Sequence, residues 1–192
     1  MKIVFIGDSV TKGTDYGAVT SVDTFAHKIG TSLGYAQSEI INAGVGSDTS
    51  AGVLQRLGTD VISKAPAVCV LMIGINDCQG ATLVATYRAN VEQIFAQLAT
   101  AGIRTVGITS NLQRGSTAEI LAFQPYLQAF EDAAGAAGVT VIDLYREVAN
   151  AYLYLSRDQF YALYVDAIHL TVQGHSFVAE LAARQKNAAH FL

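Results

Sequence analysis

The chain has 192 residues, of which 51% are hydrophobic and only 15% are charged, and its formal net charge is −4. This length suits one well-packed core, so we expect a single domain over residues 1–192. The acidic balance argues against a nucleic-acid partner, no apolar run reaches the roughly 18 residues of a membrane span, and two cysteines do not make a disulfide framework.

The first predicted element is a strand over residues 2–6, within the N-terminal sequence MKIVFIGDS. Its apolar run is short and no small-residue cleavage site follows, so we interpret it as a strand and not as a signal peptide. This interpretation predicts a cytoplasmic location, or a place as one module of a larger secreted or viral protein.

Further along the chain, short apolar runs alternate with longer amphipathic segments. The runs rich in Val and Ile predict four more strands, at residues 39–42, 67–73, 105–109 and 140–143. The amphipathic segments predict helices at residues 21–33, 49–64, 82–101, 117–137 and 171–188. Residues 144–165 fit neither pattern well, and we expect a helix and a loop there. This alternation predicts an α/β fold, a three-layer α/β/α sandwich around a five-stranded parallel sheet.

Ser9 follows the first strand directly, in the sequence IGDSVTKG. Ligands of parallel sheets bind beyond the carboxyl ends of the strands, so this position is a candidate for chemistry. A serine here is most often a helix N-cap. The hydroxyls and glycine of residues 9–14 also suit a flavin phosphate, as in a flavodoxin-like protein. Neither the P-loop pattern nor the Gly-x-Ser-x-Gly elbow is present.

A third role for Ser9, as a nucleophile, needs a base and hydrogen-bond donors for an oxyanion. His169 is the candidate base, because Asp166 precedes it by three residues and can fix the imidazole tautomer. His175 lies six residues further along the chain, and no metal-ligand pattern accompanies the two histidines, so we expect no metal. Asn76 follows the third predicted strand and is a candidate oxyanion donor.

Together these residues resemble the GDSL/SGNH hydrolase family of esterases and lipases. Four blocks carry the resemblance: GDSV at residues 7–10, NAGVGSDT at 42–49, GIND at 74–77 and DAIHLT at 166–171. The resemblance implies the flavodoxin-like SGNH hydrolase fold and a serine esterase that needs no cofactor. It also implies a catalytic triad of Ser9, Asp166 and His169, and an oxyanion hole formed by the backbone N–H groups of Ser9 and Ser47 and by the Asn76 side chain.

The second block departs from the family pattern, because the oxyanion glycine of the family aligns with Ser47. Serine keeps the backbone N–H, so the hole can form if the backbone angles at this position are open to a side chain. A shift of one residue would make Gly46 the donor, and the sequence leaves both assignments open.

The resemblance implies a carboxylic ester as substrate, and the sequence also bears on the length of its acyl group. The short chain, which has no Trp and no obvious apolar lid, favours a shallow site and a short acyl group, such as acetyl on a carbohydrate. Tyr152, Tyr154, Tyr161 and Tyr164 either face a sugar ring near His169 or serve as packing residues. The alternatives are a lysophospholipase or thioesterase for longer acyl chains and, in a different class, an FMN-binding protein.

Overall fold

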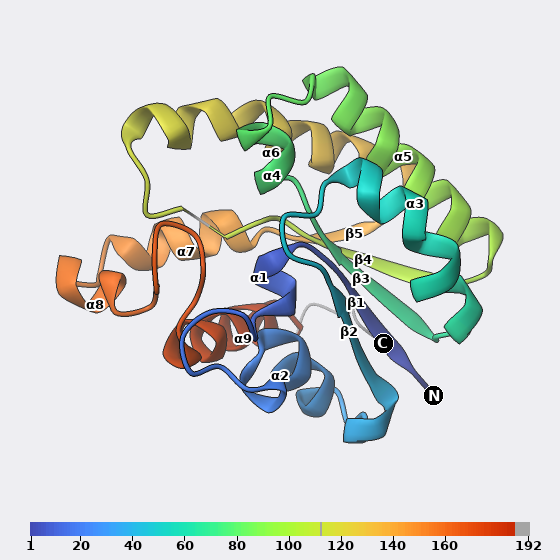
Figure 1. The fold of residues 1–192 in the computed structure, drawn as a ribbon, viewed down its shortest axis with the longest axis horizontal. Helices are drawn as coiled ribbons and strands as arrows, with labels where there is room; N and C mark the ends of the chain where they lie inside the picture. The colour runs from blue at the N-terminus through green and yellow to red at the C-terminus, as the bar shows by residue number, and fades with distance from the viewer. Residues whose placement is uncertain (112, 187–192) are drawn as a thin grey trace.

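The structure is a computed structural model that describes residues 1–111 and 113–186 (Figure 1). Its centre is one sheet of five parallel strands in the spatial order β2-β1-β3-β4-β5. The strands are β1 (Ile3–Gly7), β2 (Ile40–Gly44), β3 (Val68–Met72), β4 (Arg104–Ile108) and β5 (Thr140–Ile142). Each coincides with a predicted strand, and the ends shift by no more than about two residues, as strand boundaries commonly do.

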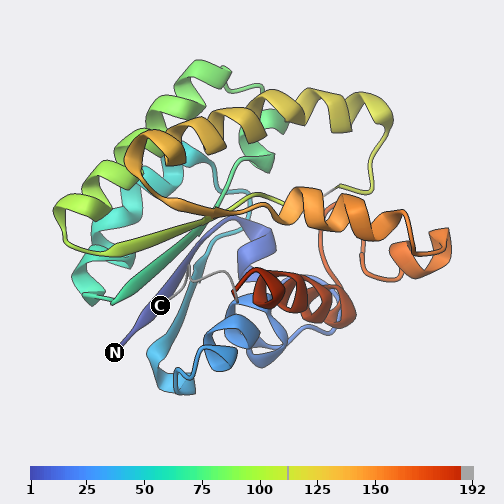
Figure 2. The ribbon, with the colours of Figure 1, turned by 180° about the vertical axis from the view of Figure 1, so that it is seen from behind.

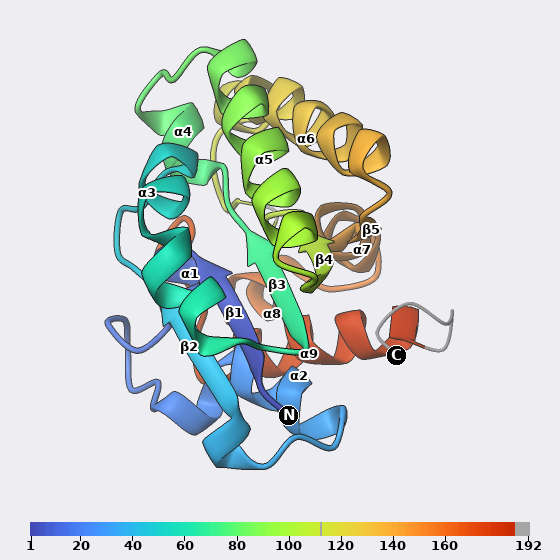
Figure 3. The same ribbon diagram turned by 90° about the vertical axis from the view of Figure 1, so that its right-hand side faces the viewer.

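Helices cover both faces of this sheet. The α-helices are α1 (Ser9–Lys12), α2 (Phe25–Ser32), α3 (Ser50–Asp60), α4 (Ile75–Gln79), α5 (Val84–Thr100), α6 (Thr117–Ala137), α7 (Leu144–Tyr152), α8 (Arg157–Tyr161) and α9 (Val172–Lys186). Short 3₁₀ turns are η1 (Ser21–Asp23), η2 (Gln37–Glu39) and η3 (Ile62–Lys64). Figure 3 shows α3, α5 and α6 on one side of the sheet, and Figure 2 shows α2 and α9 side by side on the other. The predicted three-layer α/β/α fold is confirmed.

Strand β1 shows why the apolar runs are nearly continuous. Ile3 and Phe5 pack into the cluster with α2, α7 and α9, whereas Val4 and Ile6 pack into the cluster with α3, α5 and α6. Successive side chains of a strand point to opposite faces, and here both faces are covered. Each of these four side chains is at most 1% exposed, a burial worth roughly 1.5–3 kcal/mol per large apolar side chain.

The helices differ from prediction where capping residues interrupt the apolar periodicity. Residues 21–24 do not continue α2: Thr24 is extended and its side chain accepts a hydrogen bond from the N–H of His27, which makes it the N-cap. Residues 144–165 form two helices, because Ser156 caps α8 in a capping box with Gln159. The short helices α1 and α4 were not predicted. The last two residues of the predicted helix 171–188 lie outside the described residues.

The strand order places β1 at the functionally important point of the sheet. β1 pairs with β2 on one side and with β3 on the other. The connection from β1 to β2 and the connection from β2 to β3 therefore run in opposite directions across the sheet. Open α/β sheets form their ligand crevice at the carboxyl end of such a strand. Residues directly after Gly7 therefore lie where the fold itself favours a binding site.

Candidate active site

Ser9 lies at the carboxyl end of β1, in the first position of α1. Asp8 starts this helix, because its Oδ1 accepts a hydrogen bond from the N–H of Val10 at 2.9 Å. Position 7, directly before Asp8, must be glycine, since a Cβ on Gly7 would lie 2.1 Å from the carbonyl oxygen of Met72. The tight turn thus holds Ser9 at the sheet edge, with 6% of the residue exposed.

Ser9, His169 and Asp166 form a continuous hydrogen-bonded chain. Ser9 Oγ lies 2.8 Å from His169 Nε2, and His169 Nδ1 lies 2.7 Å from Asp166 Oδ2. A carboxylate only accepts hydrogen bonds, so Nδ1 carries the proton and Nε2 is the acceptor that faces the hydroxyl. The fold therefore brings the predicted nucleophile and base together across a separation of 160 residues.

Asp166 is held as an ionised partner of this imidazole. Partial burial acts to raise the pKa of Asp166, but hydrogen bonds from the backbone N–H groups of His169 and Ile168, both 2.8 Å long, and from the imidazole lower that pKa below its usual value. The two backbone bonds end on Oδ1 and the imidazole bond on Oδ2, so both carboxylate oxygens are fixed. An ionised, oriented carboxylate stabilises an imidazolium.

Tyr16 covers one face of the His169 ring. The two ring centroids lie 3.3 Å apart, and the ring planes differ by 9°. Tyr16 belongs to the loop between α1 and η1, where no hydrophobic periodicity marks it, and sequence reasoning did not identify it. An aromatic face packed against the imidazole restricts the rotation of that ring.

The backbone at Ser47 lies in the left-handed region that glycine adopts readily, at the position where the pattern of the resembled family has glycine. Ser47 has a φ of 59°, in the left-handed region, whereas Gly46 is not among the glycines with positive φ. Serine tolerates this region at a modest cost. The backbone N–H groups of Ser9 and Ser47 donate to no group among the described residues, so both are available to a ligand.

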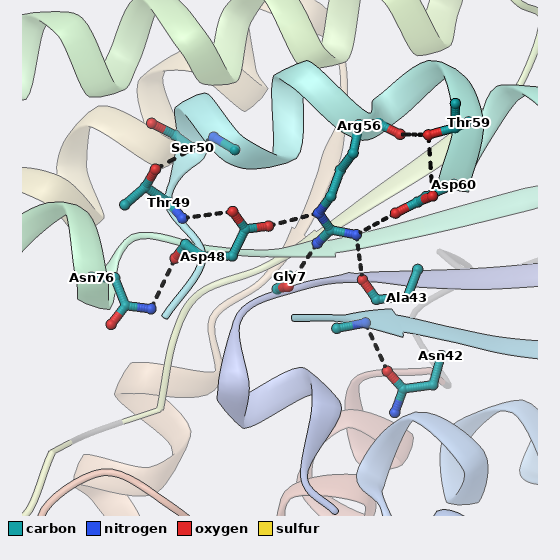
Figure 4. A network of polar contacts seen from close by, with 12 residues as sticks. Gly7, Asn42, Ala43, Asp48, Thr49, Ser50, Arg56, Thr59, Asp60 and Asn76 are labelled. Atoms are coloured by element: carbon teal, nitrogen blue, oxygen red, sulfur yellow. Dashed lines mark hydrogen bonds and ion pairs between the residues drawn. The ribbon is translucent and has the colours of Figure 1, made fainter. Parts of the chain in front are cut away.

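Asn76, in α4, is linked to the loop that carries Ser47. Its Nδ2 donates a hydrogen bond to the carbonyl oxygen of Asp48 at 2.8 Å (Figure 4). An amide nitrogen has two hydrogens, so one remains for a ligand. Asp77, the next residue, accepts bonds from the N–H and Oγ of Ser50 at 2.9 and 2.6 Å, which fastens the start of α3 to α4.

Arg56, in α3, connects the ends of β1 and β2, and sequence reasoning missed it because it reads as an ordinary polar helix residue. Its guanidinium donates to the carbonyl oxygens of Gly7 at 3.0 Å and Ala43 at 2.7 Å, and it pairs with the Asp48 carboxylate at 2.7 Å (Figure 4). A further bond reaches Asp60 at 2.9 Å. One planar group therefore fixes the segment before Ser9 relative to the segment around Ser47.

Asp8 is a second buried carboxyl beside the nucleophile. It is 1% exposed, and its Oδ2 has no hydrogen-bond partner among the described residues. Burial raises the pKa of Asp8 to about 7, the N–H of Val10 opposes this rise, and the charges of Asp48 and Asp77 add to it. The Asp8 carboxyl therefore keeps its proton to a higher pH than an exposed aspartate does.

The remaining candidates take different places. His175 is buried and accepts a hydrogen bond from the N–H of Phe25 at 3.2 Å, so its ring belongs to the core and does not join His169. Tyr164 is buried at 5% exposure, Tyr154 is 88% exposed, and Tyr152 and Tyr161 line a cavity near the Asp166–His169 turn.

Neither a cluster of metal ligands nor a membrane-spanning helix is found within residues 1–111 and 113–186. No three His, Cys, Asp or Glu side chains in this part of the chain gather as metal ligands. None of the helices described there combines the length and apolar character needed to cross a bilayer.

Comparison with solved structures places this arrangement among known folds. A G-D-S-L family protein from Desulfitobacterium hafniense DCB-2 superposes with a TM-score of 0.76 at 19% identity, over 95% of this chain and 98% of that chain. The acetylxylan esterase Axe2 from Geobacillus stearothermophilus gives 0.78 at 20%, over 96% and 93%. The acetyl xylan esterase AlAXEase gives 0.78 at 22%, over 96% and 98%.

Sequence comparison gives the family. A search of curated proteins finds no significant match. The family model for GDSL-like lipases and acylhydrolases, however, matches residues 5–177, which include the segments of Ser9, Ser47, Asn76, Asp166 and His169. The match spans most of the chain, so this protein belongs to the GDSL-like lipase/acylhydrolase family.

Proposed function

We propose that this protein is a serine esterase that removes short acyl groups, in particular acetyl groups on a carbohydrate. The observation that carries the proposal is the chain of hydrogen bonds from Ser9 Oγ through His169 to Asp166. Such a chain turns a weakly nucleophilic hydroxyl into an attacking group, because the imidazole takes the proton as the new bond forms.

In the acylation step, Ser9 Oγ bonds to the ester carbonyl carbon while His169 Nε2 takes the hydroxyl proton. The carbonyl oxygen becomes an oxyanion, which accepts hydrogen bonds from the N–H groups of Ser9 and Ser47 and from Asn76 Nδ2. Each such donor lowers the barrier by about 3–4 kcal/mol. Collapse breaks the ester C–O bond, and the His169 imidazolium gives its proton to the leaving alcohol.

In the deacylation step, His169 takes a proton from a water molecule as that water attacks the acyl carbon. The second tetrahedral intermediate expels Ser9 Oγ, which regains its proton from His169, and the carboxylic acid leaves. Asp166 stays ionised throughout and stabilises the imidazolium in both steps.

The acetyl preference is supported by two of the structural relatives, which are named acetylxylan esterases. The solved catalytic mutants of Axe2 replace a serine, an aspartate and a histidine three positions after that aspartate. Asp166 and His169 have the same spacing in this chain. The family also contains lipases, so hydrolysis of longer acyl chains is the second candidate. An FMN phosphate at residues 9–14 is disfavoured, because Ser9 is engaged by His169 and the buried Asp8 lies beside it.

The proposal is tested with p-nitrophenyl esters from acetate to octanoate and longer. We expect kcat/KM to be highest for acetate and Ser9→Ala to abolish turnover while circular dichroism and Tm stay unchanged. Ser63→Ala, at an exposed serine in η3, is the matched control and should retain full activity. Unchanged activity in Ser9→Ala would refute the mechanism, and a preference for chains of eight or more carbons would favour the lipase alternative.

A further inference from the structure

A cavity of about 240 Å³ lies beside the turn that carries Asp166 and His169. It is formed by the loop leading into α6 and by α7 and α8, which lie below that loop at the left of Figure 1. Its lining includes Gln113, Arg114, Thr117, Tyr152, Phe160 and Tyr161. The surface is thus made of aromatic rings, a cation and amide groups, which is the combination that binds polar ring-shaped ligands.

The cavity wall is hydrogen-bonded to the catalytic turn. The N–H of Arg114 donates to the carbonyl oxygen of Ala167 at 2.7 Å, and Asn111 Nδ2 donates to the carbonyl oxygen of Ile168 at 3.2 Å. Ala167 lies two residues before His169, so their Cα atoms are at most about 7 Å apart. The cavity therefore borders the turn that carries His169, and a ligand bound there lies beside this turn.

The positive charge of Arg114 at the cavity has no carboxylate partner among the described residues. The guanidinium groups of Arg114 and Arg157 lie 4.8 and 5.0 Å from the centre of the same Tyr161 ring. Neither forms an ion pair within residues 1–111 and 113–186, whereas Arg56, Arg88 and Arg146 all do. Arg157 also hydrogen-bonds the Tyr161 side chain and interacts with the charge of Asp158, so Arg114 is the guanidinium of this pair that is left for an anionic ligand.

The nearest acidic side chains do not pair with Arg114. Glu119 is engaged in the capping box of Ser116, with its carboxylate on the N–H and Oγ of that residue. Asp158 interacts electrostatically with the adjacent Arg157, and no ion pair joins it to Arg114 among the described residues. Gln113, at 7% exposure, adds an amide with no hydrogen-bond partner among the described residues. Both the cationic and the amide groups are consequently available to a ligand.

We propose that this cavity binds the alcohol part of the ester through an anionic group, as in an acetylated sugar that carries a carboxylate. Arg114 contacts the anion, Tyr161 and Tyr152 contact the ring, and Gln113 binds hydroxyl groups. A planar guanidinium pairs with two oxygens of a carboxylate, and a sulfate or phosphate on the sugar offers the same chemistry. This inference rests on the proposed esterase activity and specifies its substrate.

The test compares kcat/KM for acetylated galacturonate oligosaccharides, acetylated xylo-oligosaccharides and acetylated sugar phosphates in the parent and in Arg114→Met. We expect the parent to prefer an anionic ester over the neutral xylo-oligosaccharide. We expect Arg114→Met to reduce the anionic-to-neutral ratio roughly ten- to a hundredfold, mainly through KM. Arg88→Met, at an ion-paired arginine on α5, should leave the ratio unchanged. The anionic ester that shows the larger preference identifies the group as carboxylate or phosphate.

A binding measurement separates this inference from the esterase proposal. Calorimetry with the Ser9→Ala protein and deacetylated galacturonate oligosaccharides needs no turnover, and we expect the affinity to fall in Arg114→Met and with added salt. Absence of esterase activity with retained, Arg114-dependent binding would refute the esterase proposal alone. Equal rates on anionic and neutral esters, or an unchanged ratio in Arg114→Met that still shows the parent Tm, would overturn the anionic subsite.

Discussion

The ring of Tyr16 lies parallel to the imidazole of His169, with 3.3 Å between their centroids. The imidazole is held in its plane by Asp166 at Nδ1 and by Ser9 at Nε2, and Tyr16 closes one of its two faces. In the proposed mechanism, this contact stabilises the positive charge that His169 acquires during turnover.

Replacing Tyr16 tests this contact. We expect Tyr16→Leu to lower kcat about 3- to 10-fold with little change in KM, because the imidazole loses an aromatic neighbour worth roughly 0.5–1.5 kcal/mol. Tyr16→Phe keeps the ring and should restore most of kcat. Steady-state kinetics on p-nitrophenyl acetate checks both. A larger loss in Tyr16→Phe than in Tyr16→Leu would assign the effect to the hydroxyl and contradict the stacking argument.

Arg56 should affect both stability and turnover. Its side chain is 16% exposed and that of Asp48 is 10% exposed, so Arg56→Met removes the cationic partner of a largely buried carboxylate and one hydrogen-bond donor from each of the Gly7 and Ala43 carbonyl oxygens. We expect the free energy of unfolding to fall by about 3 kcal/mol and kcat to fall as the Ser47 loop shifts. Urea unfolding and ester hydrolysis measure the two effects.

The control for Arg56 is Arg88, whose ion pairs with Glu92 and Asp132 are exposed. Arg88→Met should cost less than about 1 kcal/mol and leave kcat unchanged. Arg56→Lys should behave like Arg56→Met, because an ammonium group cannot reproduce the planar fork. Full stability and activity in Arg56→Lys would show that charge alone, and not this geometry, is sufficient.

Asp8 should make stability depend on pH. Because burial raises the pKa of Asp8 to about 7, the folded protein keeps a proton that the unfolded chain releases above about pH 3.8. Asp8 therefore has no effect below pH 3.8, and it lowers stability progressively as the pH rises to about 7, by roughly 4 kcal/mol in total. Asp8→Asn keeps the cap on Val10 and removes this loss.

Urea unfolding at pH 5 and pH 8 checks the prediction for Asp8. The stability difference between Asp8→Asn and the parent should be larger at pH 8 than at pH 5. Asp15→Asn, which alters an exposed carboxylate paired with Lys12, should show no such trend. An equal difference at both pH values would mean that Asp8 ionises at its ordinary pKa.

Position 47 offers a backbone test of the oxyanion loop. The left-handed φ of 59° is accessible to glycine without strain and is unfavourable for a β-branched residue. We expect Ser47→Gly to retain activity and stability, because the backbone N–H remains, and Ser47→Val to lose about 1–3 kcal/mol of stability together with most of its activity. Thermal unfolding and kcat measure this. Tolerance of Ser47→Val would place the donor elsewhere, with Gly46 as the next candidate.

The fold and the pairing of Ser9 with His169 could both be predicted from the pattern of strands in the sequence. Strands buried on both faces leave continuous apolar runs, and the residues after them meet at one edge, so Ser9 and His169 could be brought together by topology. The blocks GDSV and DAIHLT, which resemble those of a serine esterase family, then indicate ester hydrolysis as the reaction.

Residues whose partners are set by tertiary packing could not be predicted. Tyr16 lies in a loop, where a side chain follows no period, and its contact depends on how residues 13–20 turn back over His169. Arg56 has the spacing of an ordinary helix surface residue, and only the approach of β1 and β2 gives it buried acceptors. Helices α1 and α4 are too short for an amphipathic pattern to emerge.

The 160-residue separation between Ser9 and His169 has a consequence for biosynthesis. A ribosome synthesises Ser9 well before His169, so a nascent chain carries the hydroxyl without its imidazole partner until the segment of His169 has left the exit tunnel. Under the proposed esterase activity, ester cleavage reports that both distant segments have been made and have docked, and fragments that end before His169 would be inactive.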